Sequence, residues 1–507
     1  MIARALISVA VVAAAVSLTA QQRTGGTIVL PEPDSPFVAF NIWIKAGSQN
    51  DPAGKEGLAA VTAALLAEGA TTEDSYDQIR AKLYPMAAGY GATTDKEMTV
   101  FRGVVHRDHV DAYYRLFGNA FLRPAFAEAD FARVKTRTLN DVERTRRYAR
   151  DEELSKDLLF REAYRGTPYE HPVDGYVSSV RAITLDDVKA FHARYYVRNN
   201  IVVGVGGGYP DGLVQRVRGD VDRLPDVPVP PVPAPRPRMP DGIHVLIVDK
   251  PTDATAISLG FPIALVRGQP DFFAMMAANS WFGEHRNPFS HLYQVLRESR
   301  GVNYGDYSYI EAFPLGYATQ VPPVHTARRS HLFEIWIRPV SRTSATDLHD
   351  RALFTTRAAW RELKTLADDG LTAQALADAQ QFLSNFSLNY AQTVSRRLSY
   401  AIDDAFYDLA APGFLASIRP GLARLDRAGV NAAITRHLQA DNMYVVFITQ
   451  DAEAFKRKLL SGEPTPITYA GERPAALRAE DEIIARFPLP VRPENVRIES
   501  IDQVLER

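Results

Sequence analysis

The sequence predicts an α+β fold made of two duplicated lobes, each a mixed sheet packed with helices, which a proline-rich linker joins. Two observations predict this arrangement. Residues 183–205 and 425–448 both read as a short amphipathic helix, a polar turn that ends in Asn, and a fully apolar, β-branched strand. A proline-rich stretch, residues 224–240, separates these two copies. Because proline disfavours helix interiors and central strands, this stretch should be a stiff, extended spacer that holds the lobes at a set distance.

Residues 1–20 have the layout of a secretory signal peptide. One positive charge at Arg4 precedes an apolar run and a small-residue end at Ala20. The alternative is an uncleaved membrane anchor, but the apolar run is shorter than the roughly 20 residues that a membrane-spanning helix needs. We therefore expect cleavage between Ala20 and Gln21, no membrane span in the mature chain, and a periplasmic or secreted protein.

The first lobe is expected to occupy residues 21–223. It opens with a strand, a turn and a second strand over residues 26–47, and a helix follows at about residues 57–68. A helical pattern then fills residues 130–160, before the helix-to-strand unit at residues 183–205 closes the lobe. Strands and helices of this kind form one sheet with helices packed on it.

The second lobe, residues 241–473, repeats this order. Residues 242–265 again read as strand, turn and strand, a helix follows at about residues 270–282, and a helical pattern fills residues 348–390. The tail, residues 474–507, has no counterpart in the first lobe. We expect it to be a C-terminal extension that lies along the outside of a lobe.

Composition excludes several classes of function. The chain is 46% hydrophobic and 23% charged, with a formal net charge of -2 and a pI near 6.6, so no basic field is available to bind nucleic acid. Cysteine is absent, which removes disulfides, thiolate zinc sites and cysteine nucleophiles. Residues 204–209, GVGGGY, lack the spacing of a dinucleotide-binding loop and are better explained as a glycine turn.

One helical segment, residues 46–71 with the sequence AGSQNDPAGKEGLAAVTAALLAEGAT, resembles the signature helix region of the pitrilysin/insulinase metallopeptidase family. Active members carry H-x-x-E-H there, because two histidines four residues apart bind zinc and the Glu activates the metal-bound water. The resemblance places the histidines at Ala60 and Ala64 and the glutamate at Ala63. A methyl group can neither bind a metal nor accept a proton, so we expect no catalytic residue and no zinc in this chain.

The family's third zinc ligand, a Glu on a later helix, falls near Asp141 or Glu143, where it has no pair of histidines to complete. Two other groups could be considered as metal ligands, but each is better explained by surface hydrogen bonding. The first group is His106, Asp108 and His109, and the second is Glu284, His285 and His291.

The second lobe keeps a different motif of this family. Residues 291–313, HLYQVLRESRGVNYGDYSYIEAF, resemble the segment in which an R-G-x-x-Y pattern supplies an Arg and a Tyr that hold the substrate peptide across a chamber from the zinc. The matching residues are Arg300 and Tyr304, with Gly301 giving the tight turn between helix and strand. The alternative is that Arg300 pairs with Glu298 or another carboxylate and that Tyr304 packs in the sheet.

The resemblance covers nearly the whole mature chain, including residues 166–207. In the first lobe it aligns the strand at residues 90–101, YGATTDKEMTVF, with the edge strand on which family members lay their substrate. Gly91 stands where active relatives usually have Asn, so backbone pairing with a peptide is retained and the side-chain contribution is lost.

The resemblance therefore implies a non-catalytic subunit of a periplasmic zinc peptidase. In two-chain members of the family one chain brings the zinc helix, and the other brings the Arg and Tyr to the peptide. Zinc is then expected in a partner subunit of the same family. The alternative is a cell-envelope scaffold or peptide-holding protein without a catalytic role. An active metallopeptidase with a non-standard site is the least favoured reading.

Overall fold

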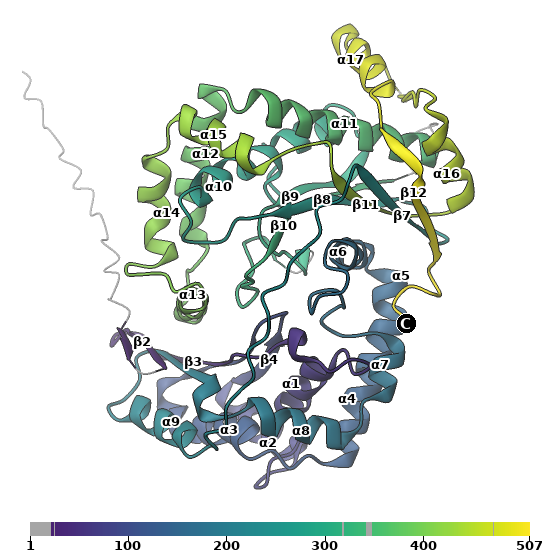
Figure 1. Ribbon diagram of the computed structural model, residues 1–507. Coiled ribbons are helices and arrows are strands. Elements are labelled where there is room, and N and C mark those ends of the chain that lie inside the picture. The colour runs from purple at the N-terminus through teal and green to yellow at the C-terminus, as the bar shows by residue number, and fades with distance from the viewer. Residues whose placement is uncertain (1–21, 25, 317–318, 341–346, 470) are drawn as a thin grey trace, which may run out of the picture.

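Two six-stranded sheets face one another, with most helices on their outer sides (Figure 1). The computed structural model describes residues 22–24, 26–316, 319–340, 347–469 and 471–507. The predicted signal peptide, residues 1–20, lies outside the described residues. The mixed α+β class with two duplicated lobes, predicted from the sequence, is confirmed.

The sheet of the first lobe has the strand order β1-β2-β6-β3-β5-β4. Only the pairing of β2 with β6 is parallel, and the remaining neighbours are antiparallel. Its strands are β1 (Gln22–Thr24), β2 (Thr27–Pro31), β3 (Phe37–Ile44), β4 (Gly89–Thr94), β5 (Thr99–His106) and β6 (Ile201–Gly207). The predicted strand, turn and strand at residues 26–47 are β2 and β3.

Residues 90–101 form a hairpin and not the single strand that the sequence predicted. The Asp95 amide donates to the carbonyl of Met98 and closes a turn between β4 and β5. Three charged residues of this turn, Asp95, Lys96 and Glu97, are all at most 4% exposed. Most turns are recognised in a sequence by glycine and by exposed polar residues. This turn consists of buried charged residues, so the sequence did not reveal it and the two strands were predicted as one.

Helices of the first lobe cover one face of this sheet. The apolar side chains on that face of β3, β5 and β6 pack mainly against α1, α3, α8 and α9. The helices are α1 (Leu58–Glu68), α2 (Tyr76–Leu83), α3 (Val110–Leu122), α4 (Glu128–Asn140), α5 (Arg147–Ala149), α6 (Asp151–Ala163), α7 (Val177–Ala182), α8 (Leu185–Tyr195) and α9 (Leu213–Asp222).

The second lobe repeats the plan, with the strand order β12-β7-β11-β8-β10-β9. Its strands are β7 (Ile243–Asp249), β8 (Ala256–Ile263), β9 (Asn303–Tyr309), β10 (His331–Pro339), β11 (Met443–Thr449) and β12 (Val491–Ser500). Its helices are α10 (Phe272–Gly283), α11 (Leu348–Asp369), α12 (Ala373–Phe386), α13 (Val394–Phe406), α14 (Phe414–Ala423), α15 (Arg427–His437), α16 (Ala452–Ser461) and α17 (Ala475–Ala485). As in the first lobe, the first two strands and the helix-to-strand unit supply the centre of the sheet.

Each lobe lends one helix to the inner face of the other lobe's sheet (Figure 1). Helix α6 of the first lobe packs on β8 and β11, and α13 of the second lobe packs on β3 and β6. The two lobes are therefore packed directly against one another. The sequence predicted that the proline-rich spacer sets the distance between them, and this is wrong.

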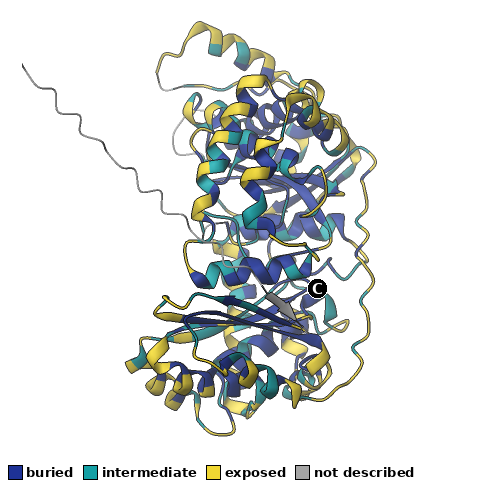
Figure 2. Cartoon of the chain, turned by 90° about the vertical axis from the view of Figure 1, so that its left-hand side faces the viewer, coloured by how far each residue is buried: buried dark blue, intermediate teal, exposed yellow. Residues whose placement is uncertain are grey.

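The linker and the tail connect the lobes in different ways. Residues 224–240 contain no helix or strand and are exposed over most of their length (Figure 2). Residues 474–507 were expected on the outside of a lobe, but β12 joins the second sheet as its edge strand, parallel to β7. The chain then returns to the first lobe, where the Val177 amide donates to the Leu505 carbonyl at 2.8 Å. Within the described residues no helix has the length and apolarity that a membrane span requires.

Candidate functional site

Helix α1 is held at its start by a buried carboxylate. The Asp51 side chain accepts hydrogen bonds from the amides of Gly57 and Ala59, both at 2.7 Å, and so satisfies donors that the first helical turn leaves open. Burial raises the pKa of Asp51 well above its usual value, although both amides act in the opposite direction. Gly57 has φ +96°, and a Cβ there would lie 2.6 Å from the Asp174 carbonyl oxygen, so only glycine fits.

The zinc-ligand positions on α1 carry no ligand. Ala63 is buried, and Ala60 and Ala64 are partly exposed, so the helix face is lined by methyl groups. The candidates for the third ligand are engaged elsewhere. Asp141 is 3.6 Å from Arg150, and Glu143 pairs with Arg181 at 2.9 Å. These residues do not fit a zinc ion.

The two other histidine groups do not assemble into a metal site. His106 is 3.4 Å from Asp108, but both side chains are largely exposed. In the second group the histidines have separate partners, because His291 pairs with Glu362 at 2.7 Å and His285 contacts the Tyr309 hydroxyl at 2.9 Å. Across the described residues, no three side chains of the His, Cys, Asp or Glu type gather closely enough to hold a metal ion.

Strand β4 ends the first sheet and has no strand partner on its outer side among the described residues. Gly91 lies on this strand, and a Cβ placed there would meet nothing within 4 Å, so the missing side chain leaves open space. A groove of about 470 Å³ lies beside the start of β4 and is lined mainly by α1, α2 and the turn before the strand. Its apolar and aromatic members include Tyr76, Ile79, Leu83, Tyr84 and Tyr90.

Arg300 is buried in an ion-pair network and is not free to hold a peptide. Its Nε donates to Asp481 and its Nη2 to Glu480, both on α17 and both at 2.7 Å, while Nη1 donates to the Val295 carbonyl at 2.8 Å. Burial lowers the pKa of Arg300, but the two carboxylates outweigh it and raise the pKa above its usual value. The structure therefore supports the structural alternative for this residue, although with carboxylates of the tail and not with Glu298.

Tyr304 lies on β9 with 68% of its surface exposed, and a different arginine accompanies it. The guanidinium of Arg297 is 4.5 Å from the centre of the Tyr304 ring and 4.9 Å from that of Tyr293. Arg297 belongs to the π-helical turn Tyr293–Glu298, and the chain turns into β9 at Gly301, where φ is +64°. The segment therefore presents Arg297 on the strand's exposed side and turns Arg300 inward.

Sequence reasoning missed Arg297. The segment LRESRG contains two arginines three residues apart, and either could accompany Tyr304. The acidic pair Glu480–Asp481 was a usable signal, because a buried arginine requires a carboxylate partner. That signal lay in the tail, about 180 residues away in sequence.

The fold and these residues define a two-lobed peptidase-type chain whose zinc helix has lost its ligands. Two family models match it in succession. The model described as insulinase (peptidase family M16) matches residues 27–175, and the model described as peptidase M16 inactive domain matches residues 182–383. The chain belongs to the M16 peptidase family, and it lacks that family's zinc motif.

Three relatives with similar sequences are each less than 25% identical to this chain. An uncharacterized zinc protease of Bacillus subtilis is 22% identical over 57% of this chain and 69% of its own length. One from Streptomyces coelicolor is 24% identical over 57% of this chain and 63% of its own length. The alpha subunit of the mitochondrial-processing peptidase of Caenorhabditis elegans is 23% identical over 34% of each chain.

Solved structures share the fold over a larger part of the chain. A peptidase M16 inactive domain from Pseudomonas fluorescens has a TM-score of 0.72 at 23% identity, and covers 85% of this chain and 97% of its own. A protease from Helicobacter pylori has a TM-score of 0.67 at 16% identity, and covers 83% and 96%. At these identities the likeness concerns the fold.

Proposed function

We propose that this chain is a non-catalytic subunit of a periplasmic or secreted zinc peptidase of the M16 family. A second chain of the same family supplies the zinc ion, and this chain contributes Arg297 and Tyr304 to binding of the peptide substrate. The observation that carries the proposal is the exposed Tyr304 ring with a guanidinium stacked on it, in a chain whose zinc-ligand positions are Ala60, Ala63 and Ala64.

The chemistry of the pair suits an extended peptide. A guanidinium offers several N–H donors in a fixed plane and a tyrosine hydroxyl offers one more, so both can donate to peptide carbonyls. Stacking of Arg297 between Tyr293 and Tyr304 restricts its orientation before any peptide arrives. Such a contact stabilises by about 0.5–1 kcal/mol at an exposed site.

The edge of β4 offers a second element for the same peptide. An extended segment can add to an open sheet edge through main-chain hydrogen bonds, which require no particular side chain. Gly91 gives no contact of its own, so recognition here rests on the backbone and on the neighbouring groove.

The test is to co-express this chain with a zinc-bearing partner from the same source, isolate the complex, and measure zinc content and peptide hydrolysis. Arg297→Ala and Tyr304→Phe should leave assembly and zinc unchanged and lower kcat/KM by roughly tenfold, because each removes a donor to a peptide carbonyl. Arg424→Ala, an exposed arginine of the same lobe, is the matched control and should have no effect.

Two results would contradict this proposal. Unchanged turnover in both variants would remove Arg297 and Tyr304 from peptide binding. Recovery of a stable assembly that contains neither zinc nor peptidase activity would favour the alternative of a cell-envelope scaffold.

A further inference from the structure

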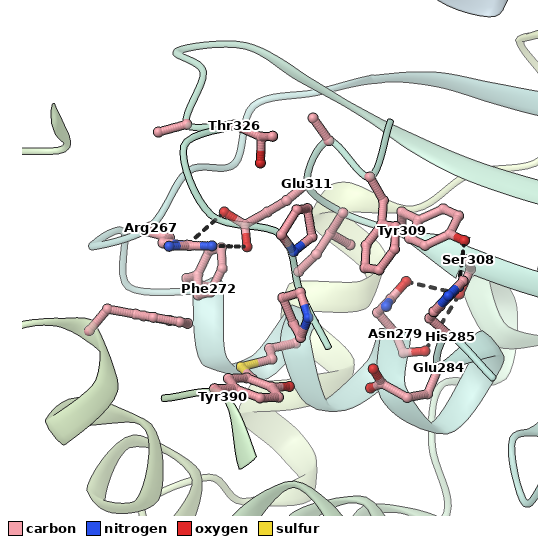
Figure 3. A pocket seen from close by; sticks show the side chains of 18 residues that line it. Arg267, Phe272, Asn279, Glu284, His285, Ser308, Tyr309, Glu311, Thr326 and Tyr390 are labelled. Atoms are coloured by element: carbon pink, nitrogen blue, oxygen red, sulfur yellow. Dashed lines mark hydrogen bonds and ion pairs between the residues drawn. The ribbon is translucent and has the colours of Figure 1, made fainter. Parts of the chain in front are cut away.

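A cavity of about 80 Å³ lies inside the second lobe, and the Glu284 and His285 side chains are part of its wall. It is lined by α10, the end of β9 and the loop after it, with Tyr390 beneath it in Figure 3. Phe414 is also part of the wall. Glu284, Glu311 and Thr326 line it and are only partly buried.

Most polar groups on the cavity wall are already paired. Arg267 forms a two-pronged ion pair with Glu311, with Nε–O and Nη2–O distances of 2.8 and 3.2 Å. Both ring nitrogens of His285 are engaged, one with the Tyr309 hydroxyl at 2.9 Å and the other with the Thr319 carbonyl at 3.0 Å. Burial lowers the pKa of His285 to about 3, so its ring is neutral.

Glu284 differs from these groups. Burial raises its pKa to about 7, the nearby Ser280 hydroxyl opposes this, and no neighbouring cation lowers it. Glu284 is also the residue that follows α10 at its C-terminal cap, where the last carbonyl groups of the helix carry partial negative charge. A carboxylate at this point is disfavoured both by its surroundings and by the helix end.

Aromatic rings line the space that Glu284 faces. Phe272, Tyr309, Tyr390 and Phe414 all belong to the wall, and in Figure 3 Glu284 lies on the opposite side of the cavity from the Arg267–Glu311 pair. Two of these rings already carry a cation of the chain, since Lys156 Nζ is 4.2 Å from the centre of the Tyr309 ring and the Arg267 guanidinium 4.5 Å from that of Phe414. The rings therefore offer apolar surface to an alkyl chain, and the Glu284 carboxylate supplies a charge opposite to that of a cation. An anion is less favoured, because Arg267, the cationic residue among the described residues of the wall, already pairs with Glu311 and lies 3.8 Å from the Asp403 carboxylate.

We propose that this cavity binds a small alkylammonium ion, with the ammonium group against the Glu284 carboxylate and the alkyl chain among the aromatic rings. A cavity of about 150 Å³ is known to hold one benzene molecule, so about 80 Å³ suits a ligand of roughly three or four non-hydrogen atoms. A primary amine with three carbons meets this limit. A bound cation neutralises Glu284 and also compensates the negative end of α10.

Isothermal titration calorimetry of the mature chain with n-propylammonium chloride tests this proposal. We expect saturable 1:1 binding for n-propylammonium, and no comparable binding of n-propanol or propionate. Glu284→Gln should weaken binding at least tenfold, because it removes a charge-assisted hydrogen bond while keeping the side chain's shape. Glu298→Gln, which removes an exposed carboxylate of the same lobe, should bind as the unaltered chain does.

The pH dependence gives an independent reading. The ammonium ion stays charged between pH 6 and 8, whereas a carboxyl group with a pKa of about 7 is about nine-tenths ionised at pH 8 and about one-tenth at pH 6. The affinity of the unaltered chain for n-propylammonium should therefore be about tenfold lower at pH 6 than at pH 8. The affinity of Glu284→Gln should be the same at both pH values. Absence of saturable binding, equal binding of n-propanol, or equal binding by Glu284→Gln would overturn the proposal.

Discussion

The two helices exchanged between the lobes combine apolar and polar contacts in different proportions. Helix α13 meets the first sheet mainly through an apolar surface in which Leu398 and Ile402 pack against Trp43 and Val100. It adds a hydrogen bond from Asn41 to Ser399 at 3.1 Å and an ion pair between Arg397 and Glu32 at 2.6 Å. Helix α6 meets the second sheet partly through buried polar groups. Ser155 contacts Ser258 at 2.9 Å, and the buried Lys156 ammonium donates to the Phe313 carbonyl at 2.9 Å. Buried charged groups are thus more prominent in the α6 contact, and apolar side chains in the α13 contact.

This difference shows how one architecture uses two kinds of packing. Apolar contacts are non-directional and depend on buried area, so they favour association of the lobes without selecting one alignment. Buried hydrogen bonds and ion pairs contribute little net stability but are costly when misaligned, because each unpaired group stays desolvated. The buried ion pair of the α6 contact therefore constrains the relative position of the lobes most strictly, and the α13 contact contributes mainly apolar attraction.

The largest effect is expected from the ion pair between Lys250 and Asp151, which joins the second lobe to the start of α6. Both residues are at most 9% exposed, so Lys250→Met leaves a buried carboxylate without its partner. We expect a loss of about 4 kcal/mol in the free energy of unfolding, measured by urea titration. Adding Asp151→Asn should restore part of it, and an additive loss instead would show that the two residues are not coupled.

The apolar contact should respond with a slightly smaller loss. Leu398 is fully buried, and Leu398→Ala should lower the free energy of unfolding by about 3 kcal/mol through lost apolar contact and the cavity left behind. Because Leu398 makes apolar contacts, substitution of a second, polar residue should not restore the lost free energy of unfolding in the same urea titration. A loss below about 1 kcal/mol would mean that α13 is not a major source of attraction between the lobes.

The polar contact should also make stability depend on pH. Burial raises the pKa of Glu334, which lies on β10 close to Lys156, to about 7 from an ordinary value of 4.5. Between these values the folded chain holds a proton that the unfolded chain has lost, so this residue's contribution falls as pH rises through that range. The difference in the free energy of unfolding between the unaltered chain and Glu334→Gln should change by roughly 3 kcal/mol between about pH 4.5 and 8. A flat difference would show that Glu334 is not protonated in the folded state.

The smallest effect is expected outside both contacts. Tyr304→Phe removes a hydroxyl from a ring that is 68% exposed, so the free energy of unfolding should change by less than about 0.5 kcal/mol. Thermal and urea unfolding should coincide with those of the unaltered chain. A larger loss would place Tyr304 in the packing of β9 and weaken its assignment to peptide binding.

The sequence predicted the parts of the fold that repeat and missed those that depend on distant contacts. The helix-to-strand units at residues 183–205 and 425–448 became α8 with β6 and α15 with β11, because their apolar periodicity is local. The helical pattern at residues 130–160 predicts that α6 is a helix, but it does not show that α6 is buried or against which sheet. That choice depends on Ser258 and Lys250, about 100 residues further on.

The candidate site was also predicted only in part from the sequence. The loss of zinc ligands at Ala60, Ala63 and Ala64 could be inferred from the residues, because no fold can give a methyl group a lone pair. The identity of the arginine beside Tyr304 could not, because Arg297 and Arg300 differ only in which carboxylates the folded chain brings to them.

The exchange of helices has a consequence for how the chain reaches its native state. During synthesis all the strands of the first sheet are complete at Gly207, yet the helix that covers its inner face begins only at Val394. Until then an apolar sheet surface and the unpartnered α6 remain open to solvent. Neither half is thus a self-sufficient folding unit. A chain cleaved within residues 224–240 should remain one particle, because each fragment supplies a helix that packs on the sheet of the other.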